Sequence, residues 1–196
     1  MNIAIIPARK NSKRIKNKNV KNFLSKPILF YPIQECINSK LFHKIIVSSD
    51  SDKYLELTKK KFNNCIMHKR SNKNSSHKAT TSDLLKEIIN YFNFNENHNL
   101  CCIYPCNPLL KKNNLKKTFL KFKKKKYDLL FTMAQSSIAE NSLFNFKNGK
   151  IRQCFNKNKK VINSQFQAKY YRDCGQLYWF NKKHIFRKKN LFSGYI

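Results

Sequence analysis

Short apolar runs alternate with amphipathic stretches along most of the chain. The first run, Asn2 to Ala8, is apolar almost throughout and is ended by Arg9. Such a run is typical of a strand that helices cover on both faces. Further strand-like runs lie at 44–49, 65–68, 99–105, 127–133 and 176–180.

Helical patterns separate these runs. They lie at 27–42, 52–62, 80–92 and 114–122. In the third of them, Leu84, Leu85, Ile88, Ile89 and Phe92 fall on one stripe of a helix. Strands that alternate with helices of this length predict an open, mostly parallel α/β sheet. Ligands of such sheets bind outside the carboxyl ends of the strands, so the loop that begins at Arg9 is placed to meet one.

The pattern changes at Ser142. The stretch FNFKNGKIRQCF carries an Asn148-Gly149 hairpin signal between two short strands. We therefore expect a small β excursion at about 142–168. With 196 residues and no repeat or linker, the chain as a whole fits a single domain.

The net charge of +31 raises the question of nucleic-acid binding. Only six of the 41 basic residues are arginine, whereas base recognition depends strongly on bidentate arginine. We interpret most lysines, including the run 121–126, as a solvated face. Any nucleic-acid binding is then expected to be non-specific and electrostatic.

The apolar runs and the cysteines bear on the cellular setting. None of the runs reaches the ~18 residues that a membrane span needs, and the first lacks a basic leader, so we expect a cytoplasmic protein with no membrane partner. The seven cysteines show no CxxC or Cys/His metal spacing, which predicts reduced and mostly buried thiols.

The loop after the first strand has the sequence ARKNSKRIKNKN. It contains neither a P-loop nor a GxGxxG pattern, and the whole chain has three glycines. A phosphate group would therefore be held by side-chain cations and hydroxyls together with loop amides. The candidates are Arg9, Ser12, Lys13 and Lys18.

Several motifs together resemble one family. AIIPARKNSKRIKNKNVKNF, IIVSSD, HKRS followed by SSHKATTSD, and CIYPCNP occur in the order and separations of the CMP-nonulosonate (sialic-acid-type) cytidylyltransferases. The resemblance covers essentially the whole chain. Tyr104 and the stretch SQFQAKYYRDCGQLYW are similar to the branch that activates pseudaminic acid.

The resemblance implies a fold and a reaction. The fold would be the Rossmann-like nucleotide-diphospho-sugar transferase fold, in which the β excursion forms a homodimer. The anomeric hydroxyl of a nine-carbon 2-keto acid sugar would attack the α-phosphate of CTP and release pyrophosphate. Mg²⁺ and cations would stabilise the charge on the phosphates.

The resemblance also implies roles for single residues. Arg9 and Lys18 would be the catalytic cations. The expected CTP contacts are Arg9, Ser12, Lys13, Lys18, Asn19, Arg70, Thr80 and Thr81. The expected sugar contacts are Tyr104, Asp173 and Gln176. His77 stands where relatives tend to have Asp, and we interpret it as a surface substitution.

The metal site is the point at which the sequence departs from the family. Members continue past a segment like LFSGYI into a strand with an Asp-x-Asp pair that binds Mg²⁺, and then a final helix, whereas this sequence stops at Ile196. Of its ten acidic residues, Asp50 and Asp173 are the candidate ligands, acting together with the phosphates of CTP.

Two alternatives remain open. The first is the same reaction on N-acetylneuraminic or legionaminic acid, because the sugar contacts alone distinguish these substrates. The second is a truncated, inactive relative that binds nucleotide or polyanion without turnover. The absent Asp pair and the charge of +31 motivate this second alternative.

Overall fold

The computed structural model describes residues 1–10, 12, 15–136, 144–153, 170–187 and 191–192. These residues divide into two compact units. The first combines Met1–Phe131 with Gln176–Ile196, and the second is Thr132–Gly175.

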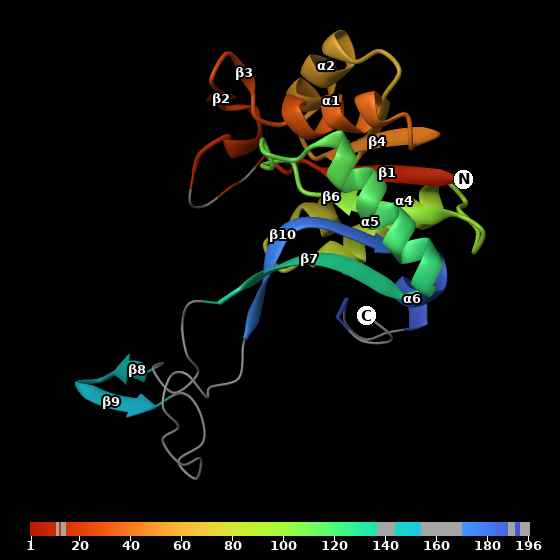
Figure 1. Cartoon of the computed structure of the whole chain (residues 1–196). Helices are drawn as coiled ribbons and strands as arrows, with labels where there is room; N and C mark the ends of the chain where they lie inside the picture. Colours follow the sequence, from red (N-terminus) through yellow and green to blue (C-terminus); the bar gives the residue numbers. More distant parts are fainter. Residues whose placement is uncertain (11, 13–14, 137–143, 154–169, 188–190, 193–196) are drawn as a thin grey trace. The chain divides into compact units, whose positions relative to one another are not determined.

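The described strands of the larger unit build a mostly parallel sheet of order β5-β4-β1-β6-β10-β7 (Figure 1). The parallel strands are β1 (Asn2–Pro7), β4 (Lys44–Ser49), β5 (Ile66–Lys69) and β6 (Asn99–Ile103). β10 (Tyr171–Phe180) runs antiparallel to β6 and is followed in the order by β7 (Leu129–Gln135). The predicted α/β class is confirmed.

Helices cover both faces of this sheet, as the alternation of side chains along β1 shows. Ala4 and Ile6 belong to a core cluster with α1 (Phe30–Ser39) and α5 (Lys112–Lys125). Ile3 and Ile5 belong to a second cluster with α4 (Thr81–Tyr91) and α6 (Lys182–Arg187). The remaining helices are α2 (Asp52–Lys61), the short α3 (Asn72–Ser75) and the 3₁₀ turn η1 (Lys18–Val20). The nearly continuous apolar run of β1 was the sequence signal for this two-sided burial.

The first helix begins later than predicted. Pro27 does not open it, because Lys26–Pro27 form β3, which pairs with β2 (Asn22–Phe23) in a small hairpin. Leu24 occupies the turn of this hairpin with a φ of 54°. The helix then starts at Phe30, where the apolar stripe reaches the core.

The smaller unit contains the predicted hairpin. β8 (Phe144–Lys147) pairs with β9 (Lys150–Gln153), and Asn148 and Gly149 both have positive φ, 52° and 74°. Two successive positive φ values are those of a type I′ turn, which Asn-Gly favours. The part of the predicted excursion at 154–168 lies outside the described residues.

The thiols of the described core are buried as expected. Cys36, Cys65, Cys101 and Cys102 are free and buried, and burial raises the pKa of the Cys102 thiol to about 12. Cys106 and Cys174 differ in being partly exposed. Among the helices that the structure describes, none is both long and apolar enough to cross a membrane.

Candidate functional site

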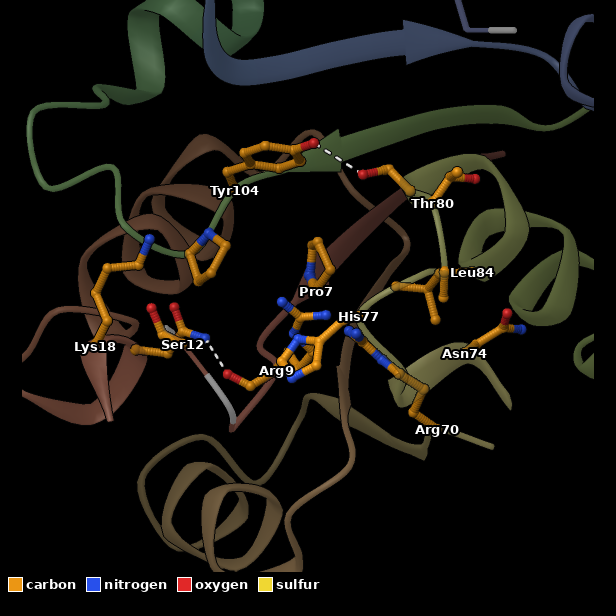
Figure 2. Close-up of a pocket in the computed structure, with 14 residues that line it drawn as sticks. Pro7, Arg9, Ser12, Lys18, Arg70, Asn74, His77, Thr80, Leu84 and Tyr104 are labelled. Atoms are coloured by element: carbon orange, nitrogen blue, oxygen red, sulfur yellow. Dashed lines mark hydrogen bonds between the residues drawn. The ribbon is translucent and has the colours of Figure 1, made fainter. Parts of the chain in front are cut away.

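The carboxyl ends of the parallel strands meet at one edge of the sheet. Asp50, Arg70 and Tyr104 follow directly on the ends of β4, β5 and β6, and Arg9 comes two residues after the end of β1. A cleft of about 490 Å³ opens at this edge (Figure 2), which is within the usual range for small-ligand sites. Eight of the residues predicted for the site line it: Arg9, Ser12, Lys18, Asn19, Arg70, Thr80, Thr81 and Tyr104.

The loop after β1 is held in shape by Asn19, which is buried. Its Nδ2 donates to the carbonyl oxygen of Arg9 over 2.7 Å, and its Oδ1 accepts from the Cys106 thiol over 3.2 Å. Nη1 of Arg9 donates to the carbonyl oxygen of Ser76 over 3.0 Å. Both ends of the Asn19 amide are thus used within the protein, so its contribution to the cleft is to hold the backbone that carries Arg9 and Lys18.

Arg70 is a buried cation on the wall of the cleft. Its side chain is anchored by Nη2, which donates to the carbonyl oxygen of Ser48 over 3.2 Å. Nε is buried and has no hydrogen-bond partner among the described atoms. In the described part of the chain, no carboxylate forms an ion pair with this guanidinium.

The surroundings of Arg70 do not compensate its charge fully. Burial lowers the pKa of its guanidinium, the carboxylate of Asp50 raises it, and the neighbouring cation of Arg9 lowers it again. A buried cation of this kind is costly unless an anion joins it. The position of Arg70 therefore indicates an anionic ligand.

Hydroxyl groups form the opposite wall. Thr80 is the N-cap of α4: its Oγ1 accepts from the Asp83 amide and donates to the Asp83 carboxylate, at 3.2 and 2.7 Å. Thr81 Oγ1 lies 2.9 Å from the hydroxyl oxygen of Tyr104. The Tyr104 ring packs on Tyr178 with the ring centroids 5.4 Å apart. The hydroxyls are therefore fixed before any ligand arrives.

Two polar lining residues were not predicted as ligand contacts. Asn74 and His77 come from the segment after β5, and Figure 2 shows both at the cleft together with Arg70. His77 is exposed, as expected, but it belongs to the cleft wall rather than to remote surface. The motif SSHKATTSD was the sequence signal, since its threonines had already been assigned to the nucleotide.

The remaining predicted contacts are not among the described residues that line the cleft. Lys13 lies outside the described residues. Gln176 is not among the described residues that line the cleft, and its carbonyl oxygen accepts from the Tyr104 amide over 2.9 Å. Asp173 belongs to the smaller unit, where its Oδ1 accepts from the Gly175 amide over 2.9 Å.

The described residues that line the cleft provide no carboxylate for Mg²⁺. Their cleft wall contains Arg9, Lys18 and Arg70 but no Asp or Glu. Asp50 Oδ1 accepts from the Lys10 amide over 2.7 Å, and within the described ranges no three His, Cys, Asp or Glu side chains gather around a common point. Three cations without a carboxylate favour a polyanionic ligand.

Comparison with known proteins agrees with this chemistry. The family model for cytidylyltransferases matches residues 3–193. The chain is 32% identical to the "Pseudaminic acid cytidylyltransferase and UDP-2,4-diacetamido-2,4,6-trideoxy-beta-L-altropyranose hydrolase" of Helicobacter pylori over 97% of its own length but only 37% of that protein. It is 30% identical to the pseudaminic acid cytidylyltransferase of Campylobacter jejuni, covering 95% of this chain and 83% of the relative.

More distant likenesses follow the same line. The N-acylneuraminate cytidylyltransferase of Escherichia coli is 24% identical over 98% of this chain and 45% of its own. Among solved structures, a CMP:2-keto-3-deoxy-manno-octonic acid synthetase complexed with CTP superposes with a TM-score of 0.68 at 13% identity, covering 94% of this chain and 75% of that one. The structural match confirms the nucleotidyltransferase type of fold.

Proposed function

The chain belongs to the cytidylyltransferase family, and on that premise we propose that it transfers CMP from CTP to a nonulosonic acid. One observation of the structure supports the proposal above others: the buried guanidinium of Arg70 lines the cleft with its Nε unpartnered among the described atoms. A triphosphate would supply the missing anion.

The cations define what the chain contributes to the reaction. The anomeric oxygen of the sugar forms a bond to the α-phosphorus of CTP, and the bond from this phosphorus to the bridging oxygen of pyrophosphate breaks. Negative charge grows on the leaving pyrophosphate and on the transferred phosphoryl oxygens. Arg9, Lys18 and Arg70, fixed beforehand around the cleft, would stabilise that charge. Mg²⁺ would supply Lewis-acid chemistry when it accompanies the phosphates, and no Asp or Glu is among the described residues that line the cleft.

We propose pseudaminic acid as the sugar. Relatives of that name reach 32% and 30% identity, whereas the N-acylneuraminate enzyme of Escherichia coli reaches 24%. Tyr104, which the resemblance assigns to the sugar, lines the cleft with its hydroxyl oriented by Thr81. We also propose a homodimer in which the smaller unit forms the contact, which light scattering of the purified protein would measure.

The experiment that tests the reaction is pyrophosphate release from CTP and Mg²⁺ with pseudaminic, N-acetylneuraminic or legionaminic acid, singly and in competition. We expect release with pseudaminic acid, and consumption of pseudaminic acid first when the sugars compete. Preferred consumption of another sugar would refute the sugar assignment and leave the transfer reaction standing.

A second candidate is a protein that binds nucleotide or polyanion without turnover. The charge of +31 and the lack of a carboxylate among the described lining residues favour it. Folded protein that binds CTP but releases no pyrophosphate with any of the three sugars would establish this candidate and refute the first.

A further inference from the structure

The segment 70–77 supplies the cleft with Arg70, Asn74 and His77. Within it, α3 (Asn72–Ser75) buries none of its residues. Hydrophobic contact therefore does not anchor this part of the wall, and polar contacts have to fix its position.

Glu87, on α4, provides such contacts. Its Oε1 accepts from the Ser71 amide over 2.9 Å, and its Oε2 accepts from the Ser71 hydroxyl over 2.5 Å and also from Nδ2 of Asn74. Ser71 is itself the N-cap of α3, with its hydroxyl oxygen accepting from the Asn74 amide. One carboxylate thus binds the first turn of α3 at three points.

The helix that carries Glu87 is rigidly placed. Leu84, Leu85 and Ile88 of α4 are buried in the core. Burial by itself would raise the pKa of the Glu87 carboxyl, but the hydrogen bonds from Ser71 and Asn74 lower it below its ordinary value. The carboxylate is therefore ionised at neutral pH. Because α4 is fixed in the core, the hydrogen bonds to Glu87 fix the position of the segment 70–77.

The contact of Glu87 with His68 invites comparison with an activated serine. Nε2 of His68 lies 3.7 Å from Glu87 Oε1, and Nδ1 lies 3.0 Å from the Ser48 hydroxyl. Ser48 and His68 are only 0% and 2% exposed, so no substrate reaches this hydroxyl. Burial also lowers the pKa of His68, with the Glu87 charge opposing this shift. The Ser48, His68 and Glu87 arrangement is structural: it ties the carboxylate to β4 and β5.

Ser48 connects the arrangement to the cleft. Its hydroxyl meets His68, while its carbonyl oxygen accepts from Nη2 of Arg70. At the other end of the segment, the Ser76 carbonyl oxygen accepts from Arg9. The segment held by Glu87 thus begins with Arg70, which is anchored on Ser48, and contacts Arg9 near its other end.

We propose that Glu87 is a positioning residue for the anion site: its carboxylate holds the segment 70–77 so that Arg70 and Asn74 are in place before CTP binds. The proposal deepens the function given above, on which it rests, and it assigns Glu87 no contact with the substrate.

The first test measures the segment without ligand. In Glu87→Gln, one oxygen can still accept from the Ser71 amide, but the amide nitrogen that replaces the second oxygen cannot accept from Ser71 or Asn74. We expect faster hydrogen–deuterium exchange of the backbone amides at 70–77, with exchange in β1 and β6 unchanged. Glu56→Gln, at an exposed position of α2, is the matched control and should leave the segment as it is. Unchanged exchange in Glu87→Gln would overturn the proposal.

The second test measures CTP affinity by calorimetry. We expect Glu87→Gln to weaken CTP binding about ten-fold, as the loss of a charged hydrogen bond would, and Glu56→Gln to have no effect. In an Arg70→Ala background the same Glu87→Gln change should add little, because both changes act through one segment. Fully additive losses would contradict the proposal.

The outcomes separate this proposal from the proposed function. Wild-type protein that fails to bind CTP refutes the function, while the exchange experiment still decides whether Glu87 holds the segment. Ser71→Ala removes only the hydroxyl contacts of an exposed residue and serves if Glu87→Gln does not fold. We expect Ser71→Ala to speed hydrogen–deuterium exchange at 70–77 and to weaken CTP binding, each by less than Glu87→Gln does. Unchanged exchange at 70–77 in Ser71→Ala would overturn the proposal.

Discussion

At the scale of single residues, the cleft combines anchored hydroxyls with a cation that lacks an anion. Arg9 and Lys18 could be proposed from the sequence because a basic loop follows the first strand, and Arg70 could be proposed only from the resemblance to a family; all three line the cleft. Asn74 and Glu87 could not be proposed, because their roles depend on hydrogen bonds between residues 13 positions apart, which no local pattern records.

Arg70→Met is expected to stabilise the ligand-free protein. It keeps most of the side-chain volume and removes a buried charge that has no ion-pair partner among the described residues. We expect the free energy of unfolding in urea to rise by about 1 kcal/mol. A clear loss of stability would show that the guanidinium is satisfied without a ligand.

Lys18→Ala is expected to impair turnover. If its ammonium group stabilises the developing phosphate charge, kcat/KM for CTP should fall about 100-fold. Lys21→Ala, in the same loop but not among the described lining residues, is the control and should retain activity. Equal activity of the two variants would remove Lys18 from the mechanism.

At the scale of elements, most strands and helices could be predicted from the sequence, whereas the order of the strands in the sheet could not. The alternation of apolar runs and helices predicted the parallel strands, since each run is short and mainly apolar. The insertion of β10 between β6 and β7 was not predictable, because the sequence of Gln176–Phe180 does not indicate which strands pair with it. Pro27 was misread as a helix start because a two-residue hairpin gives no periodic signal.

The N-terminus of α4 offers a test at this scale. Thr80→Ala removes a capping bond and should lower the free energy of unfolding by about 1 kcal/mol. Ser51→Ala is the control, because Ser51 occupies the N-cap of α2 without a side-chain capping bond. An equal decrease in the free energy of unfolding in both variants would contradict the capping role of Thr80.

The pH dependence of this cap follows from Asp83. Hydrogen bonds from the Thr80 amide and hydroxyl lower the pKa of the Asp83 carboxyl, so folding is favoured by its ionised form. This contribution is present above the ordinary carboxyl pKa and is lost as the pH falls below about 4. The difference in stability between wild type and Thr80→Ala should therefore shrink in acid, and a growing difference would contradict the assignment.

At the scale of the whole molecule, the charge of +31 is separable from the function of the cleft. The lysines of α5 are exposed, as predicted for a solvated face, and none of them lines the cleft in the described structure. Replacing Lys121, Lys123, Lys124 and Lys125 by Gln should weaken salt-sensitive binding of RNA while CTP affinity stays within about two-fold. A parallel loss of CTP affinity in calorimetry would show that this face and the cleft act together.

The measurement that tests the account most directly is CTP binding to Arg70→Gln, compared with wild type and with Arg152→Gln, which changes an exposed arginine of β9. We predict that Arg70→Gln weakens CTP binding about 100-fold, since it removes the buried cation, and that Arg152→Gln binds as wild type does. CTP affinity that is unchanged in Arg70→Gln would contradict the assignment of this cleft as the triphosphate site.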